Sequence, residues 1–314
     1  MIISMIKQLF DKDNTYALRG ICMLMIIASH TPFETDNYFY SILQFLGFDY
    51  WGAFGTGLFF LLSGYGMFLS LQRTKELNLN YFLGKIKKLF IPFFYTWIIY
   101  LLLFFILDIS KFNIHLIVDF ITLSLPLGID AWFFKVILAL YIIIILLFKI
   151  PISHRSKVII MSMIVCIYYI TFKELSFGPW WYNTVLNFPL GMMFAWSKDK
   201  MNNSYFSLLI ILLCFVFCYF TTIAFFTYIC FSLCALWFVR IINIQYIPGL
   251  KFIGTNSIFY YLLQCPLFEC FEKRLPSLLC FFTVVMMTTL LTLLYLRIEK
   301  IIISKKYKKE NAGT

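Results

Sequence analysis

Long runs of apolar residues, separated by short polar segments, are the dominant pattern along the chain. Four of these runs, at Leu89–Leu107, Trp132–Phe148, Tyr205–Phe220 and Leu278–Leu296, approach the roughly 20 residues that a helix needs to cross the hydrocarbon core of a bilayer. A protein core of this size cannot hide so much apolar surface unless lipid acts as its solvent, and in lipid the backbone must be satisfied within helices. The pattern therefore predicts helices that span a membrane.

The same pattern, followed along the whole chain, predicts about ten transmembrane helices. Pro189 and Pro266 fall inside two of them, and membrane helices tolerate such prolines because neighbouring groups satisfy the freed backbone. We expect an all-α, polytopic membrane helix bundle that forms one integral-membrane domain over residues 1–304, followed by a short basic and polar cytoplasmic tail at 305–314. The predicted spans are 15–33, 51–71, 89–107, 131–149, 157–173, 181–197, 205–221, 222–242, 255–271 and 277–298.

Composition and charge add an orientation to this bundle. Hydrophobic residues make up 62% of the chain and charged residues 13%, against roughly a quarter in soluble domains. The net charge of +11 would indicate nucleic acid as the partner of a soluble protein. With the N-terminus placed in the cytoplasm, however, 21 of the 26 Lys and Arg residues fall in cytoplasmic segments. This bias follows the positive-inside rule, so we expect both termini in the cytoplasm, the lipid bilayer as a partner and no nucleic acid.

The loops and cysteines change this picture little. The connection at 108–130 carries an apolar stripe at helical spacing, which predicts an amphipathic helix at the outer surface. The nine cysteines fall within apolar segments and form no Cys-x-x-Cys pair, so we interpret them as small packing residues. No cluster of zinc ligands is present in the sequence, and we expect no metal site.

Arg19 and His30 stand out in the first predicted span, because polar groups within a bilayer are costly and are functional candidates by default. They are 11 residues apart, which places them on one face of a helix and ~16 Å apart along its axis. A fixed cation near the cytoplasmic mouth can hold an anionic donor, and an imidazole nearer the outer side can remove a proton from an attacking group. The alternative is that Arg19 is only a topology anchor and His30 an interfacial cap.

The second predicted span contains five glycines, between Gly52 and Gly66, which allow another backbone or a ligand to approach closely. Helix packing alone explains this pattern. Together with the first span, however, it resembles the integral-membrane acyltransferase-3 family. The resemblance rests on Leu18-Arg19-Gly20 followed by His30, and on a second-helix pattern that ends in Ser63-Gly64-Tyr65. Blocks that resemble later parts of the family follow in order, at Tyr81–Pro92, Ala131–Lys135, Phe188–Gly191 and Gly254–Leu262.

This resemblance implies a bacterial protein of the cytoplasmic (inner) membrane that takes an acyl group, usually acetyl, from cytoplasmic acyl-CoA. The acceptor it implies is a hydroxyl of an envelope or exported carbohydrate, with no bound cofactor. It implies that His30 is the catalytic candidate and Arg19 its essential partner. Three candidates for binding the anionic nucleotide of CoA are Lys85, Lys87 and Lys88, for which positive-inside anchoring is an equal alternative. The residues expected to line the cavity are Ser63, Tyr65 and Trp132.

Two further positions are candidates for acceptor binding. The ninth-helix block of the family often carries His where this chain has Gln264, and Gln can form hydrogen bonds but cannot titrate. We therefore expect Gln264 to position the substrate at most. Lys135 lies one turn into the fourth predicted span, where it can pair with Asp130 or with an anionic sugar, or simply extend to the interface.

The sequence leaves two other functions open. One is a transporter or exporter of a free or lipid-linked glycan, in which Arg19 and His30 bind an anionic substrate without catalysis. The chain shows no inverted-repeat pair of broken helices to support it. The other is an acyltransferase whose acceptor is a lipid, peptidoglycan or a small metabolite.

Overall fold

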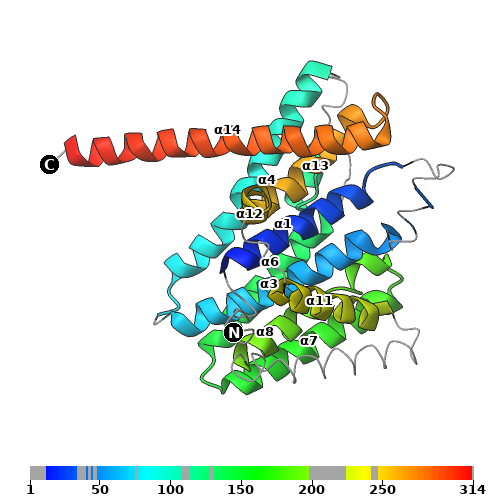
Figure 1. Cartoon of the computed structure of the whole chain (residues 1–314). Coiled ribbons are helices and arrows are strands. Elements are labelled where there is room, and N and C mark those ends of the chain that lie inside the picture. Colours follow the sequence, from blue (N-terminus) through cyan, green and yellow to red (C-terminus); the bar gives the residue numbers. More distant parts are fainter. Residues whose placement is uncertain are drawn as a thin grey trace, which may run out of the picture.

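The computed structural model is all-helical over the residues that it describes, which are 12–33, 40–41, 44, 48–74, 76–107, 114–126, 131–197, 224–241 and 247–312. These residues form eleven α-helices and two 3₁₀ helices, and no strand is present among them (Figure 1). The α-helices are α1 (Lys12–Ser29), α3 (Trp51–Arg73), α4 (Leu79–Leu107), α5 (His115–Ile121), α6 (Trp132–Lys149), α7 (His154–Glu174), α8 (Asn187–Trp196), α11 (Ala224–Ile241), α12 (Pro248–Thr255), α13 (Ser257–Phe271) and α14 (Ser277–Ala312). The 3₁₀ helices are η2 (Phe48–Tyr50) and η5 (Pro179–Trp181).

Five helical segments are long and apolar enough to cross a membrane. They correspond to the predicted spans at 51–71, 89–107, 131–149, 157–173 and 277–298. Their bounds in the structure are Phe48–Arg73, Leu79–Ile106, Trp132–Lys149, His154–Glu174 and Ser277–Ile302.

The other predicted spans take different forms. The first forms α1, which is 18 residues long, and the eighth forms α11. Only the ten residues of α8 are α-helical in the sixth, because η5 and a run of turns precede them. The ninth begins at a break between α12 and α13, where Asn256 ends the first helix and precedes the second. The predicted span at 205–221 lies outside the described residues, so the count of ten stays a prediction.

The predicted amphipathic helix after α4 is present as the short helix α5, whose Leu116 is buried. Its exposed face carries Ile117 and Phe120, which line an apolar groove against Phe94 and Ile98 of α4. Such a face suits the apolar side of a membrane interface.

The buried core lies between α1, α3, α6, α8 and α13, whereas α7 and α14 leave most of their surface exposed. In α14, for example, Leu278, Phe282 and Met286 are all at least half exposed. Lipid is the environment in which such a surface is stable. Figure 1 shows α14 lying across one side of the bundle and extending beyond it at its C-terminal end.

Four glycines allow the inner helices to pack backbone to backbone. A Cβ on Gly64 of α3 would overlap the carbonyl of Phe188, and one on Gly191 of α8 would overlap the carbonyl of Leu61. The same reciprocal arrangement joins α1 to α12, where a Cβ on Gly20 or on Gly254 would meet the backbone of the other helix. The helix-packing interpretation of the glycine-rich second span is therefore correct for Gly64.

The helix directions show which helix termini share each end of the bundle. Figure 1 shows that α1 begins, and α14 ends, at the same end of the bundle. At the opposite end α1 finishes at Ser29, and α3 and α6 begin at Trp51 and Trp132. That opposite end holds the first of two cavities.

Candidate active site

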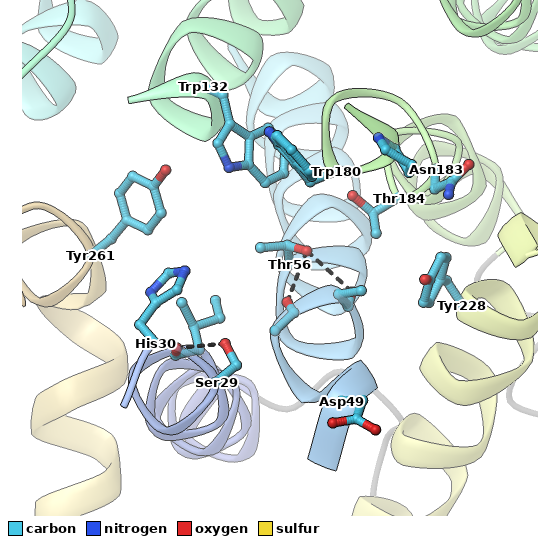
Figure 2. Close-up of a pocket in the computed structure, with 14 residues that line it drawn as sticks. Ser29, His30, Asp49, Thr56, Trp132, Trp180, Asn183, Thr184, Tyr228 and Tyr261 are labelled. Carbon is cyan, nitrogen blue, oxygen red and sulfur yellow. Dashed lines mark hydrogen bonds between the residues drawn. The ribbon is translucent and has the colours of Figure 1, made fainter. Parts of the chain in front are cut away.

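The larger polar cavity has a volume of 460 Å³ and lies where α1 ends and where α3 and α6 begin; we name it the His30 cavity. Figure 2 shows His30 and Tyr261 on one side of it and Asn183, Thr184 and Tyr228 on the other, with Thr56 between. The residues that line it come from seven elements and the turns beside them: Ile26, Ser29, His30, Asp49, Gly52, Ala53, Thr56, Trp132, Pro179, Trp180, Asn183, Thr184, Tyr228 and Tyr261.

His30 occupies the first position after α1 because the helix is terminated there by its own side chains. Ser29 Oγ donates to the carbonyl of Ile26 at 2.8 Å, and Thr31 Oγ1 donates to that of Ile27 at 3.1 Å. These bonds satisfy carbonyls that the last turn of a helix leaves open. Pro32 follows and cannot continue the helix. The imidazole of His30 is thereby held at the helix end, exposed to the cavity.

Aromatic rings and neutral hydrogen-bonding groups make up most of the remaining lining. Trp132 and Trp180 contribute indole rings, and Asn183 contributes an amide. Thr184 is 1% exposed, and its hydroxyl forms no hydrogen bond with the described residues. A buried hydroxyl without a partner is unusual, so Thr184 is free to bond a ligand in the cavity.

One acidic group, Asp49, lines the cavity among the residues that the structure describes. Its Oδ1 accepts a hydrogen bond from the hydroxyl of Tyr40 at 3.2 Å. Desolvation, followed by the charge of Asp49, raises the pKa of Tyr40 above its ordinary value. Tyr40 therefore stays protonated near neutral pH and remains a donor to Asp49.

A second, smaller cavity of 190 Å³ adjoins the first, and we name it the Arg19 cavity. Ile26 and Tyr261 line both cavities, so these two side chains form the boundary between them. The polar residues of the Arg19 cavity are Arg19, Ser63, Lys88, Tyr141, Thr255 and Ser257.

Arg19 is only partly engaged by the protein. Its Nη2 donates to the carbonyl of Leu62 at 3.4 Å, and its Nε is buried without a hydrogen-bond partner among the described residues. The one salt bridge found in that part of the chain joins Lys251 to Asp13, not Arg19 to a carboxylate. A guanidinium with an unused donor, beside a cavity, is suited to bind an anion.

The three lysines predicted to bind the nucleotide of CoA are not equivalent in the structure. Lys88 lines the Arg19 cavity. Lys85 instead donates to Ser70 Oγ at 2.9 Å and lies over the ring of Tyr81, 5.2 Å from its centroid. Lys87 is exposed and lines neither cavity.

The residues predicted to line one cavity lie in different places in the structure. Ser63 lines the Arg19 cavity and Trp132 the His30 cavity, whereas Tyr65 is buried and lines neither. Lys135 donates to Ser124 Oγ at 3.0 Å and lines neither cavity. Asp130, its predicted partner, lies outside the described residues.

Gln264 lines neither the His30 cavity nor the Arg19 cavity. It is fully buried, and its Nε2 donates to the carbonyl of Tyr261 at 3.1 Å. Its side chain neighbours the His30 imidazole, and its Oε1 has no hydrogen-bond partner among the described residues. The structure therefore brings together His30 and Gln264, which are 234 positions apart in the sequence numbering.

Several cavity residues were missed from the sequence. Trp180 carried a signal, because the run from Pro179 to Tyr182 reads as an interfacial aromatic anchor. Tyr261 lay in the block Gly254–Leu262 that resembles the family, although nothing marked it as a cavity residue. Thr184 and Tyr228 carried no signal, since a single hydroxyl in an apolar segment is indistinguishable from a packing residue before the helices are placed.

Comparison with protein families settles the class of this protein. The model of the acyltransferase-3 family, described as an acyltransferase domain, matches residues 16–297. The chain belongs to the acyltransferase-3 family. It is an acyltransferase and, with its apolar helices, a multi-pass membrane protein. The family membership contradicts the transporter alternative. Searches of curated proteins and of solved structures returned no match.

The matched region includes both cavities of this acyltransferase. Arg19, His30 and Gln264 all lie within it, as do the packing glycines of α1, α3, α8 and α12. The blocks that resemble the family thus divide into two kinds of position. Gly20, Gly64, Gly191 and Gly254 join helices, whereas polar residues such as Arg19 and His30 face the cavities.

Proposed function

We propose that this protein is a membrane O-acyltransferase, most simply an O-acetyltransferase. In this proposal the acyl group moves from cytoplasmic acyl-CoA to a hydroxyl of a cell-surface or exported carbohydrate, across a bacterial cytoplasmic membrane. The observation that carries the proposal is the pair of adjoining cavities. One presents the cation of Arg19, the other presents the imidazole of His30, and they share the walls formed by Ile26 and Tyr261.

The Arg19 cavity supports binding of the donor. Acyl-CoA combines anionic phosphates with a long, narrow pantetheine arm. A cavity of 190 Å³ suits the arm better than the nucleotide. The phosphates would then bind at the mouth, where Arg19 and Lys88 supply positive charge, and the thioester would lie toward Tyr261. Arg19 and His30 are ~16 Å apart along α1, a span that an extended pantetheine arm can bridge.

The His30 cavity supports binding of a carbohydrate. Indole rings such as those of Trp132 and Trp180 can pack against the apolar faces of a sugar ring, while Asn183 and the Thr184 hydroxyl can bond its hydroxyl groups. Small-molecule sites are commonly built in this way, from aromatic walls and a few placed polar groups.

The chemistry requires one proton acceptor. In the proposed reaction a ring nitrogen of His30 takes the proton of the sugar hydroxyl as its oxygen attacks the thioester carbonyl carbon. The tetrahedral intermediate collapses as the carbon–sulfur bond breaks. The CoA thiolate then takes the proton back from the imidazolium of His30. The products are an O-acyl ester and free CoA thiol, and the enzyme returns to its starting state.

The proposed direction of transfer rests on charge and topology. The positive-inside distribution supports a cytoplasmic N-terminus, and with it a cytoplasmic position for the cationic end of α1. The His30 cavity then opens on the opposite side, because α1 ends there. The start of α1 and the end of α14 lie at one end of the bundle, which supports an even number of spans (Figure 1).

The test compares two histidines in cells that display the acceptor. His30→Ala should abolish the acyl esters on surface glycans, as measured by mass spectrometry, because the general base is lost. His115→Ala is the matched control, since His115 is on α5 and lines neither cavity. Unchanged glycan esters in the His30 variant, at normal protein level in the membrane, would contradict the proposal.

A further inference from the structure

Gln264 is the polar residue whose placement the proposed reaction leaves unexplained. It lies in the middle of α13 and is 0% exposed, although Gln is mostly found at protein surfaces. A buried amide is costly unless its donor and acceptor are both satisfied. The surroundings of its two polar atoms therefore indicate what the residue does.

The amide nitrogen of Gln264 is held by its own helix. Nε2 donates to the carbonyl of Tyr261, one turn earlier, at 3.1 Å. Pro266 follows two residues later within α13 and removes a backbone donor from the same stretch of helix. This bond fixes the rotation of the side-chain amide, and with it the direction of the amide oxygen.

The amide oxygen of Gln264 is the group left for His30. It is buried and has no hydrogen-bond partner among the described residues, so it is free to accept one. The Gln264 side chain neighbours the His30 imidazole, because α13 packs against α1 and Tyr261, one turn before Gln264, lines the same cavity as His30. A neutral imidazole has one N–H donor and one bare nitrogen, and a hydrogen bond to one of them decides which nitrogen carries the proton.

We propose that Gln264 is a positioning residue, whose amide oxygen accepts a hydrogen bond from one ring N–H of His30. The other ring nitrogen is then unprotonated and faces the cavity, where it can accept the proton of the acceptor hydroxyl. This inference rests on the proposed role of His30 as the base. It assigns to Gln264 the orientation of the imidazole, instead of contact with the substrate.

A neutral partner also sets how readily His30 gives its proton back. A carboxylate at position 264 would stabilise the imidazolium strongly, whereas an amide oxygen orients the ring without adding charge. The other titratable groups that line the cavity with His30 are Asp49, Tyr228 and Tyr261. The Asp49 carboxylate is already engaged by Tyr40.

The test is a set of substitutions in the purified full-length protein, assayed with acetyl-CoA and acceptor across a range of pH. Gln264→Leu keeps the size of the side chain but removes the acceptor. It should lower kcat by about 10- to 100-fold, as loss of an orienting partner does elsewhere, while the KM for acetyl-CoA stays within about twofold. Gln72→Leu is the matched control, because Gln72 is exposed at the end of α3.

Gln264→Glu separates orientation from a structural role. The carboxylate restores the acceptor and stabilises the imidazolium, so the acidic limb of the kcat profile should move to higher pH by about one unit or more. Activity should recover, relative to Gln264→Leu, on the alkaline side of that limb. A merely structural role would change activity without moving the limb.

Two results would overturn the inference. One is a Gln264→Leu protein with the kcat of the wild type. The other is a Gln264→Glu protein whose pH limb coincides with that of the wild type. His30→Ala, measured in parallel, keeps the two proposals apart. If His30→Ala retains activity, the proposed role of His30 as the base is wrong. If His30→Ala loses activity while Gln264→Leu keeps the kcat of the wild type, the role of His30 stands and only the role of Gln264 is refuted.

Discussion

The packing of α8 against α3 predicts a large effect from the smallest possible change, Gly191→Ala. The added Cβ would overlap the carbonyl oxygen of Leu61 and would lie 2.8 Å from both the Leu61 carbonyl carbon and the Tyr65 nitrogen. Unstrained contacts between such atoms are about 3.5 Å, so relieving these two contacts alone requires roughly 0.7 Å of separation, and clearing the carbonyl oxygen requires more. All three atoms belong to backbone, which cannot move aside as a flexible side chain would.

The expected cost of Gly191→Ala lies at the upper end of that for overpacked cores, about 3 kcal/mol. For a chain of this size, that corresponds to an apparent Tm lower by roughly 6–9 °C, measured by thermal unfolding in detergent. Gly84→Ala is the matched control, because a Cβ on Gly84 of α4 meets nothing within 4 Å. Its better helix propensity should leave the Tm equal or slightly higher. Equal Tm values for the two variants would refute the close approach of α3 and α8.

Three substitutions in the cavities test donor and acceptor binding separately. Trp180→Ala should raise the KM for the acceptor in steady-state kinetics by about tenfold, since a ring stacked on the ligand contributes on the order of 1 kcal/mol or more. Trp196 is exposed and lines neither cavity, so Trp196→Ala should leave this KM unchanged. Thr184→Val keeps the volume and removes the unpartnered hydroxyl, so the acceptor KM should rise by about fivefold, or roughly 1 kcal/mol; an unchanged KM would exclude a bond from Thr184 to the acceptor. Lys88→Gln should raise the KM for acyl-CoA by several-fold at low salt and less at high salt, whereas Lys87→Gln should change it little; equal effects would mean that both lysines act only through general surface charge.

The sequence predicted the membrane helices well where the apolar run was long. The spans that became α4, α6 and α14 follow from hydropathy alone, because a run of that length has no other stable environment. The sixth and ninth predicted spans were less regular in the structure. The backbone there changes to turns at 182–186 and breaks at Asn256. Local bonds satisfy part of the freed backbone, since Asn183 N donates to the carbonyl of Pro179 and Phe259 N to that of Asn256.

The sequence predicted some residues of the candidate site but not how they are arranged, and this difference has a physical cause. Arg19 and His30 could be recognised because a charged or titratable group is rare in an apolar run. Their separation into two cavities, with Tyr261 at the boundary, depends on how α1, α3, α6 and α13 cross, which no local pattern records. The position of Gln264 beside His30 is of the same kind. The sequence showed that Gln264 stands where the family often has His, but only the structure shows that Gln264 neighbours His30.

The same limit applies to the lysines. Their spacing along α4 was known, yet Lys85, Lys87 and Lys88 point in different directions around the helix, and only Lys88 lines the Arg19 cavity. Lys85 is bound by Ser70, whose position in α3 is unrelated to it in sequence. Roles within a basic cluster therefore follow from tertiary contacts and not from charge alone.

Vesicles with separate inner and outer compartments show whether the acyl group passes from the Arg19 cavity on one side to the His30 cavity on the other. The protein is reconstituted in vesicles that hold a carbohydrate acceptor inside, and radiolabelled acetyl-CoA is added outside. CoA thiol should appear outside while labelled ester accumulates inside. His30→Ala should abolish both signals, and His115→Ala should leave both intact. Ester formation only when donor and acceptor share one compartment, or an undiminished signal in His30→Ala, would contradict transfer between the two cavities.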